Sequence, residues 1–117
     1  MFARAPAQGG FVGRVRFFAR NPSDLLAPLM VYKLELEAEI LRRLSLGGQS
    51  LLRDVLGAMR AKGMSEDDVE AMRALLLRLD RLRDQLDRPD ASRVGRKQFR
   101  EVVATGERLL ARLGEPA

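Results

Sequence analysis

The chain has 117 residues, enough for one domain with a hydrophobic core, and its 46% hydrophobic and 32% charged residues are typical of a globular protein. Histidine, cysteine and tryptophan are absent, which excludes imidazole acid–base catalysis, thiolate nucleophiles, disulfides and thiolate zinc sites. The formal net charge of +5 favours anionic partners such as nucleic acid or acidic lipid. We therefore expect a protein that binds rather than catalyses, with no cofactor and no metal.

The first 22 residues form a basic, phenylalanine-rich segment. They hold four arginines and no acidic residue, and four of the five phenylalanines of the chain lie in the first 18 residues. Loose alternation of apolar residues over 11–18, punctuated by glycines, predicts a short strand or an extended arm. We accordingly divide the chain into an arm, residues 1–22, and a helical domain, residues 23–117. The arm lacks the continuous apolar core of a secretory signal, so a cytoplasmic protein is expected.

The side chains of the arm suit three roles. Arginine neutralises phosphate and an aromatic face stacks on a base, a combination that suits single-stranded nucleic acid. The same residues suit an anionic membrane surface, and the phenylalanines could also simply pack on the helical body. The candidate contact residues are Phe11, Phe17 and Phe18 together with Arg14, Arg16 and Arg20.

Residues 30–40 carry two conflicting patterns. Apolar residues alternate with polar ones, which is the period of a strand. The residue types, however, are mostly leucine, glutamate, alanine and arginine, which favour helix. One apolar stripe also has helical spacing, namely Tyr32, Leu36, Ile40 and Leu44. We predict a helix from about Leu29 to Leu46, with a hairpin between residues 11–18 and 30–38 as the alternative.

Three further helices follow. The first is expected from Ser50 to about Lys62, with Gly63 after its end. Ser65 is the predicted N-cap of a long helix that Pro89 stops. The last helix should begin at Asp90 or Ser92 and run to about Leu113. Its apolar stripe contains Gly106, which predicts close approach of a neighbouring helix because glycine is otherwise unfavourable there. The fold class is therefore mainly α, a three- to four-helix bundle with an N-terminal extended arm or short strand.

Two sets of residues on these helices are candidate contact sites. A seam with +3/+4 spacing needs a partner helix, and it is long for a chain of this size; its residues are Met72, Leu75, Leu79, Leu82 and Leu86. A basic cluster shares one face at the start of the last helix and could contact an anionic partner; it consists of Arg93, Arg96, Lys97 and Arg100.

These features rank three binding functions. The first is a non-enzymatic assembly or adaptor subunit that binds a protein partner or self-associates and uses its basic arm on an anionic surface. The alternative is a sequence-nonspecific nucleic-acid-binding accessory protein, and the third is a peripheral membrane binder. No small-molecule substrate is inferred, and the identity of the partner and the oligomeric state are left open.

Overall fold

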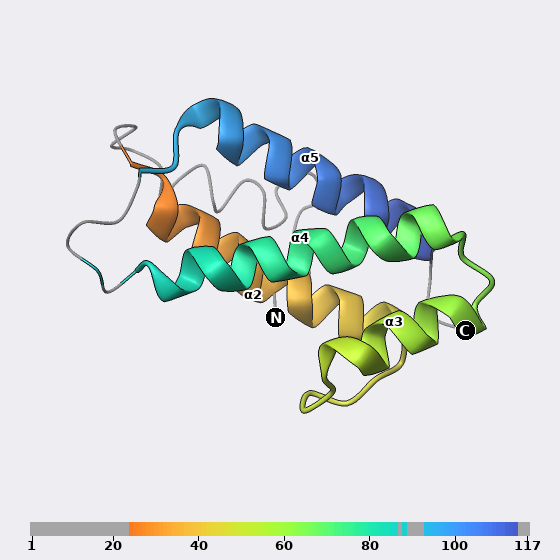
Figure 1. The fold of residues 1–117 in the computed structure, drawn as a ribbon. Helices are drawn as coiled ribbons and strands as arrows, with labels where there is room; N and C mark the ends of the chain where they lie inside the picture. Colours follow the sequence, from red (N-terminus) through yellow and green to blue (C-terminus); the bar gives the residue numbers. More distant parts are fainter. Residues whose placement is uncertain (1–23, 87, 89–92, 115–117) are drawn as a thin grey trace, which may run out of the picture.

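The computed structural model describes residues 24–86, 88 and 93–114, and the helices in these ranges are α2 (Leu26–Arg43), α3 (Leu52–Ala61), α4 (Glu66–Asp84) and α5 (Arg96–Leu113). The three long helices lie alongside one another, and the short α3 packs at one end of the bundle (Figure 1). No strand occurs in the described part of the chain. The mainly α, bundle-like fold is confirmed. The arm, residues 1–22, lies outside the described residues.

The ambiguous segment 30–40 is helical, so the hairpin alternative is wrong for this half of its pairing. Helix α2 begins three residues earlier than expected because an Asp24 carboxylate oxygen accepts a hydrogen bond from the backbone N–H of Leu26 at 3.0 Å. It ends at Arg43, and Ser45 then adopts a left-handed backbone conformation (φ 57°) that breaks the helix.

Asp24 also ties the two ends of the described chain together. The same carboxylate oxygen accepts a hydrogen bond from the N–H of Val94 at 3.1 Å, and the N–H of Leu25 donates to the Val94 carbonyl at 2.9 Å. Because the backbone of Val94 is engaged in this way, α5 starts only at Arg96, with Gly95 as its N-cap, rather than at Asp90 or Ser92. The predicted cap of α4 is confirmed, since the Ser65 hydroxyl accepts from the N–H of Asp68 at 3.1 Å.

We expect Asp24→Ala to lower the free energy of unfolding by about 1–2 kcal/mol, because it removes the acceptor for two backbone N–H groups at once. Asp24→Asn keeps an acceptor oxygen and should lose less. Urea denaturation of the two variants checks this, and equal losses for alanine and asparagine would contradict the capping role of the carboxylate oxygen.

The hydrophobic core lies between α2, α4 and α5, with α3 closing one end. The predicted stripe on α2 faces it, since Tyr32 and Leu36 are fully buried and Ile40 and Leu44 nearly so. Gly106 of α5 lies against this stripe. A Cβ atom at Gly106 would overlap the Tyr32 hydroxyl and lie 3.3 Å from a Leu36 methyl carbon. The predicted close approach at Gly106 is therefore confirmed.

Tyr32 is held in place by α5. Its hydroxyl donates a hydrogen bond to the Glu107 carboxylate at 2.8 Å. Burial, reinforced by the charge of Glu107 and by this hydrogen bond, raises the pKa of the Tyr32 hydroxyl well above its ordinary value. The hydroxyl thus stays protonated and fixes the register of α2 against α5.

Candidate functional site

The predicted seam on α4 packs within the chain. Met72 and Leu79 are fully buried, Leu75 and Leu82 are nearly so, and only Leu86 remains exposed, at 47%. Helix α4 contacts each of the other three helices, which together supply the partner surface that the seam needs. The argument for self-association from uncovered seam residues is therefore lost for four of the five positions.

The basic cluster lies at the end of the bundle where α5 begins. All four of its side chains, Arg93, Arg96, Lys97 and Arg100, are exposed. The hydrogen bonds between Asp24, Leu25 and Val94 place the point at which the arm joins the bundle beside this cluster. Two basic segments from opposite ends of the chain therefore meet at one end of the fold. The arm residues Phe11, Phe17, Phe18, Arg14, Arg16 and Arg20 lie outside the described residues.

Helix α2 carries a second apolar face that was not recognised in the sequence. Five small or apolar residues fall within about 80° of one another on a helical wheel, on the side opposite Leu36. No charged residue of α2 falls in that sector. Leu34 at its centre is 64% exposed, which makes it the most exposed of the large hydrophobic side chains described. We call this set the outer stripe; it consists of Ala27, Val31, Leu34, Ala38 and Leu41.

The period-two pattern was the signal for this face. In a helix, alternating apolar residues divide between two opposite sides. Tyr32, Leu36 and Ile40 take the core side, while Leu34 and Ala38 take the outer side. A helix that is apolar on two opposite sides is unusual on a protein surface, and its outer side is normally covered. The alternation thus indicated a surface to be covered, rather than a strand.

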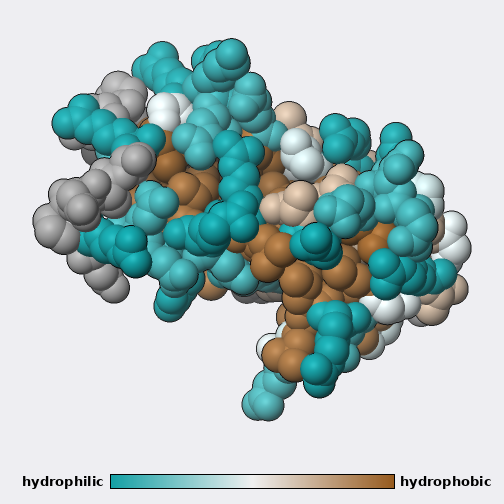
Figure 2. All heavy atoms as spheres, viewed as in Figure 1, coloured by the Kyte–Doolittle hydropathy of each residue, from teal (hydrophilic) through white to brown (hydrophobic). Residues whose placement is uncertain are grey.

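The outer stripe leads into an open groove between α2, the start of α3 and α4. The groove has a volume of about 270 Å³. Leu51 on its rim is 54% exposed. Figure 2 shows a hydrophobic area on this side of the molecule, extending from α4 towards α3 and the loop that precedes it. We call this the α2–α3 groove; its lining includes Ile40, Leu41, Leu51, Leu52, Val55 and Leu76.

Carboxylates border both the stripe and the groove. Glu35 and Glu37 lie on either side of the middle of the outer stripe, about 80° from its centre on the helical wheel. Glu37 and Asp80 also line the groove. Both form ion pairs with the buried amine of Lys33, at 2.8 and 3.2 Å. One cation therefore serves two carboxylates, which leaves this rim with a net negative charge.

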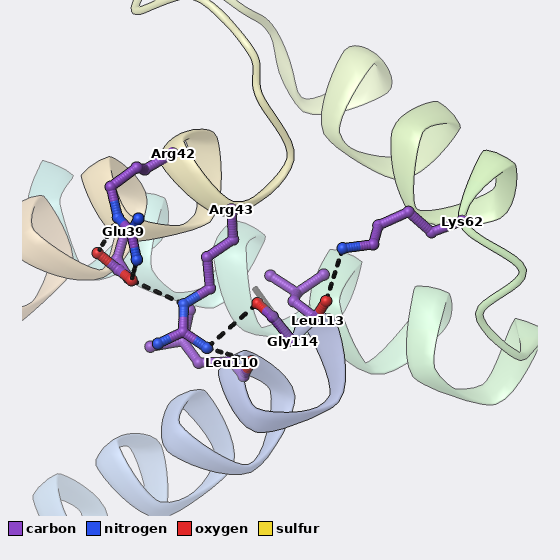
Figure 3. Close-up of polar contacts among 7 residues, drawn as sticks. All are labelled: Glu39, Arg42, Arg43, Lys62, Leu110, Leu113 and Gly114. Atoms are coloured by element: carbon purple, nitrogen blue, oxygen red, sulfur yellow. Dashed lines mark hydrogen bonds and ion pairs between the residues drawn. The ribbon is translucent and has the colours of Figure 1, made fainter. Parts of the chain in front are cut away.

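A second polar cluster holds the C-terminal end of α5 (Figure 3). Arg43 donates to the carbonyl oxygens of Leu110 and Gly114, at 3.0 and 3.4 Å. The Lys62 amine of the turn after α3 donates to the Leu113 carbonyl at 2.7 Å. Cations at a helix C-terminus satisfy its free carbonyl groups and its dipole. This cluster fastens α5 to α2 and α3 and has the character of a structural clamp.

Glu39 orients the clamp through hydrogen bonds from Arg42 and Arg43, the shortest to each at 2.6 and 2.7 Å. The hydrogen bond from Arg42 is the largest influence on its pKa, and with that from Arg43 it outweighs burial, so the pKa of Glu39 lies below its ordinary value. A lowered pKa in the folded state adds stability above the unfolded pKa, and this stability is lost as the pH falls.

We therefore expect the free energy of unfolding to decrease between about pH 5 and pH 3, and Glu39→Gln to make that decrease shallower. Arg42→Ala should make it shallower too, because it removes the main stabiliser of the carboxylate. Chemical denaturation at several pH values measures the slope. A Glu39→Gln slope as steep as that of the wild type would contradict this assignment.

Among the described residues, no group of three or more acidic side chains is placed to hold a metal ion. No helix in the described ranges is both long and apolar enough to cross a bilayer. The most distinctive feature is thus the apolar surface formed by the outer stripe and the α2–α3 groove. Comparison of the chain with protein-family models, curated proteins and solved structures found no match.

Proposed function

We propose that this protein is a non-enzymatic helical adaptor or assembly subunit that binds a segment of a partner protein along the outer stripe and into the α2–α3 groove. The observation that carries the proposal is the second apolar face of α2, with Leu34 64% exposed at its centre. Covering one leucine side chain contributes about 1.5–3 kcal/mol, so a stripe continuous with an apolar groove can support specific binding.

The charges around this surface select the chemistry of the bound segment. Glu35 and Glu37 flank the stripe, and Glu37 and Asp80 border the groove with only Lys33 between them. A segment with aromatic or aliphatic side chains interleaved with arginine or lysine would bury its apolar groups and place its cations beside these carboxylates. We therefore propose an apolar, basic segment as the ligand.

A second copy of α2 is a poorer occupant. The spacing of the stripe is symmetric about residue 36, so an antiparallel pair would oppose Leu34 to Ala38 and Val31 to Leu41. The same arrangement would bring Glu35 and Glu37 next to their own copies, and like charges facing one another disfavour the pair.

A library of random 12-residue peptides displayed on phage tests this function with the full chain as bait. We expect enriched peptides to combine aromatic or aliphatic residues with arginine or lysine, and their binding to be lost when Leu34→Lys is introduced. Ala104→Lys makes the same change of charge at an exposed position of α5 and should leave binding unchanged. No enrichment, or enriched peptides that tolerate Leu34→Lys, would contradict the proposal.

A nucleic-acid-binding function is the second candidate, and the meeting of the basic cluster with the root of the arm favours it. Single-stranded nucleic acid would contact Arg96, Lys97 and Arg100 through its phosphates, with the arm continuing the contact. Fluorescence anisotropy of a labelled 20-nucleotide single-stranded DNA, measured over a range of salt, tests it. Replacing these three residues by alanine should reduce the slope of log K against log salt by about 2.

A matched triple variant at the other end of the bundle serves as the control. Arg53, Arg60 and Arg73 are exposed, and their replacement by alanine removes the same charge. It should leave the slope close to that of the wild type. Absence of binding at low salt, or equal effects of the two triple variants, would rule this function out.

A further inference from the structure

We infer that the N-terminal arm of this chain, residues 1–22, is an internal ligand of the outer stripe and competes there with the partner segment. The inference rests on the proposed function, because it requires the stripe to be a binding surface. It adds a regulatory device: the partner binds only by displacing the arm.

The arm starts at the correct end of the stripe. The hydrogen bonds of Asp24 to Leu26 and Val94 fix the chain where α2 begins. The first residue of the stripe, Ala27, is exposed in the following turn of the same helix. A chain that reverses direction just before Asp24 therefore meets the stripe at once.

The arm is long enough to cover the stripe. Leu34 lies about 15 Å along α2 from Asp24, and Leu41 about 26 Å, at 1.5 Å per residue. An extended chain covers about 3.3 Å per residue, so Phe18 can reach about 20 Å from Asp24 and Phe11 about 43 Å. Phe18 can thus contact Leu34, and Phe11 can reach Leu41 and the mouth of the α2–α3 groove.

The composition of the arm matches the surface. Phenylalanine and valine side chains alternate loosely with arginines over residues 11–18, and the first 22 residues contain no acid. The stripe offers apolar contact to the former, and the carboxylates of Glu37 and Asp80, which share the single cation Lys33, attract the latter. This is the chemistry proposed above for the ligand, found within the same chain.

Covalent attachment favours this occupant over a free one. A short tether gives a local concentration in the millimolar range. A weak contact by the arm is therefore enough to cover Leu34 most of the time, and a partner must bind more tightly than that contact to displace it.

Disulfide trapping in the full-length chain tests the inference, since the natural sequence has no cysteine to interfere. Phe17→Cys is combined with Leu34→Cys, and in a matched control with Ala104→Cys, which is exposed on α5. Under mild oxidation at low protein concentration we expect the first pair to form an intramolecular disulfide at least tenfold faster than the control pair. Equal rates, or a disulfide-linked dimer as the main product, would overturn the inference.

A second measurement uses Leu34→Cys without an engineered partner cysteine. Its reaction with a maleimide should become at least fivefold faster when Phe11, Phe17 and Phe18 are replaced by serine, because the cover is removed. An unchanged rate would overturn the inference even if library peptides bind the stripe, whereas loss of both protection and peptide binding would overturn the proposed function as well. Circular dichroism checks that the variants remain helical.

Discussion

Replacing Gly106 by leucine is expected to lower the free energy of unfolding by at least about 3 kcal/mol, and replacing it by alanine by about 1–3 kcal/mol. The first added atom already overlaps the Tyr32 hydroxyl and lies 3.3 Å from a Leu36 methyl carbon. Tyr32 has no room to yield, because it is fully buried and its hydroxyl is bonded to Glu107 at 2.8 Å. Helix α5 would have to move away from α2, which opens the core along both helices. Thermal and urea denaturation measure the loss.

A double-mutant cycle separates this collision from a general intolerance of α5 to substitution. Tyr32→Phe removes the oxygen atom that a Cβ at Gly106 would strike. Gly106→Ala should therefore cost at least about 1 kcal/mol less in the Tyr32→Phe background than in the wild type. Equal costs in the two backgrounds would contradict the assignment of the close approach to these two residues.

Replacing Lys33 by glutamate is expected to be the other severely destabilising change, by about 3–5 kcal/mol at pH 7. The residue is 5% exposed, and its amine contacts the carboxylates of Glu37 and Asp80. Burial alone favours the neutral amine, but the hydrogen bonds and charges of these two carboxylates prevail and raise the pKa of Lys33. A glutamate there would place three carboxylates together, with the central one buried.

The pH dependence and a matched variant make this prediction specific. Lowering the pH from 7 to about 5 should recover part of the lost stability of Lys33→Glu, because neighbouring like charges raise the pKa of a buried carboxyl and it becomes neutral. Lys33→Met keeps the volume without a charge. It should cost less than about 1.5 kcal/mol, because the side chains of Glu37 and Asp80 are 34% and 62% exposed and water can solvate them. Similar losses for Lys33→Met and Lys33→Glu would contradict this account.

Local signals predicted the helical content well. The cap at Ser65 and the glycine in the last helix are properties of a few neighbouring residues, and both were correctly assigned. The start of α5 was placed too early, because it depends on hydrogen bonds between Val94 and residues that lie some 70 positions away. Contacts of that kind have no signature in a local pattern.

The candidate site was predicted less well, for two physical reasons. The seam from Met72 to Leu82 has the spacing of an intermolecular contact, but the same spacing serves packing inside one chain, and only the tertiary arrangement distinguishes the two cases. The outer stripe was hidden because its residues, Leu34 and Ala38, were counted towards a strand pattern. Once α2 is known to be helical, the same alternation marks a face that the described part of the chain leaves exposed.

The central claim is that the outer stripe of α2 binds apolar, basic segments. The most direct measurement is fluorescence anisotropy of a labelled peptide with the sequence of residues 9–20, GGFVGRVRFFAR, titrated with the full chain in which Phe11, Phe17 and Phe18 are serine. We predict saturable binding that Leu34→Lys weakens at least tenfold, as expected for loss of a leucine contact worth about 1.5–3 kcal/mol, and that Ala104→Lys leaves unchanged. Absence of binding, or equal binding by the Leu34→Lys and Ala104→Lys chains, would contradict the claim.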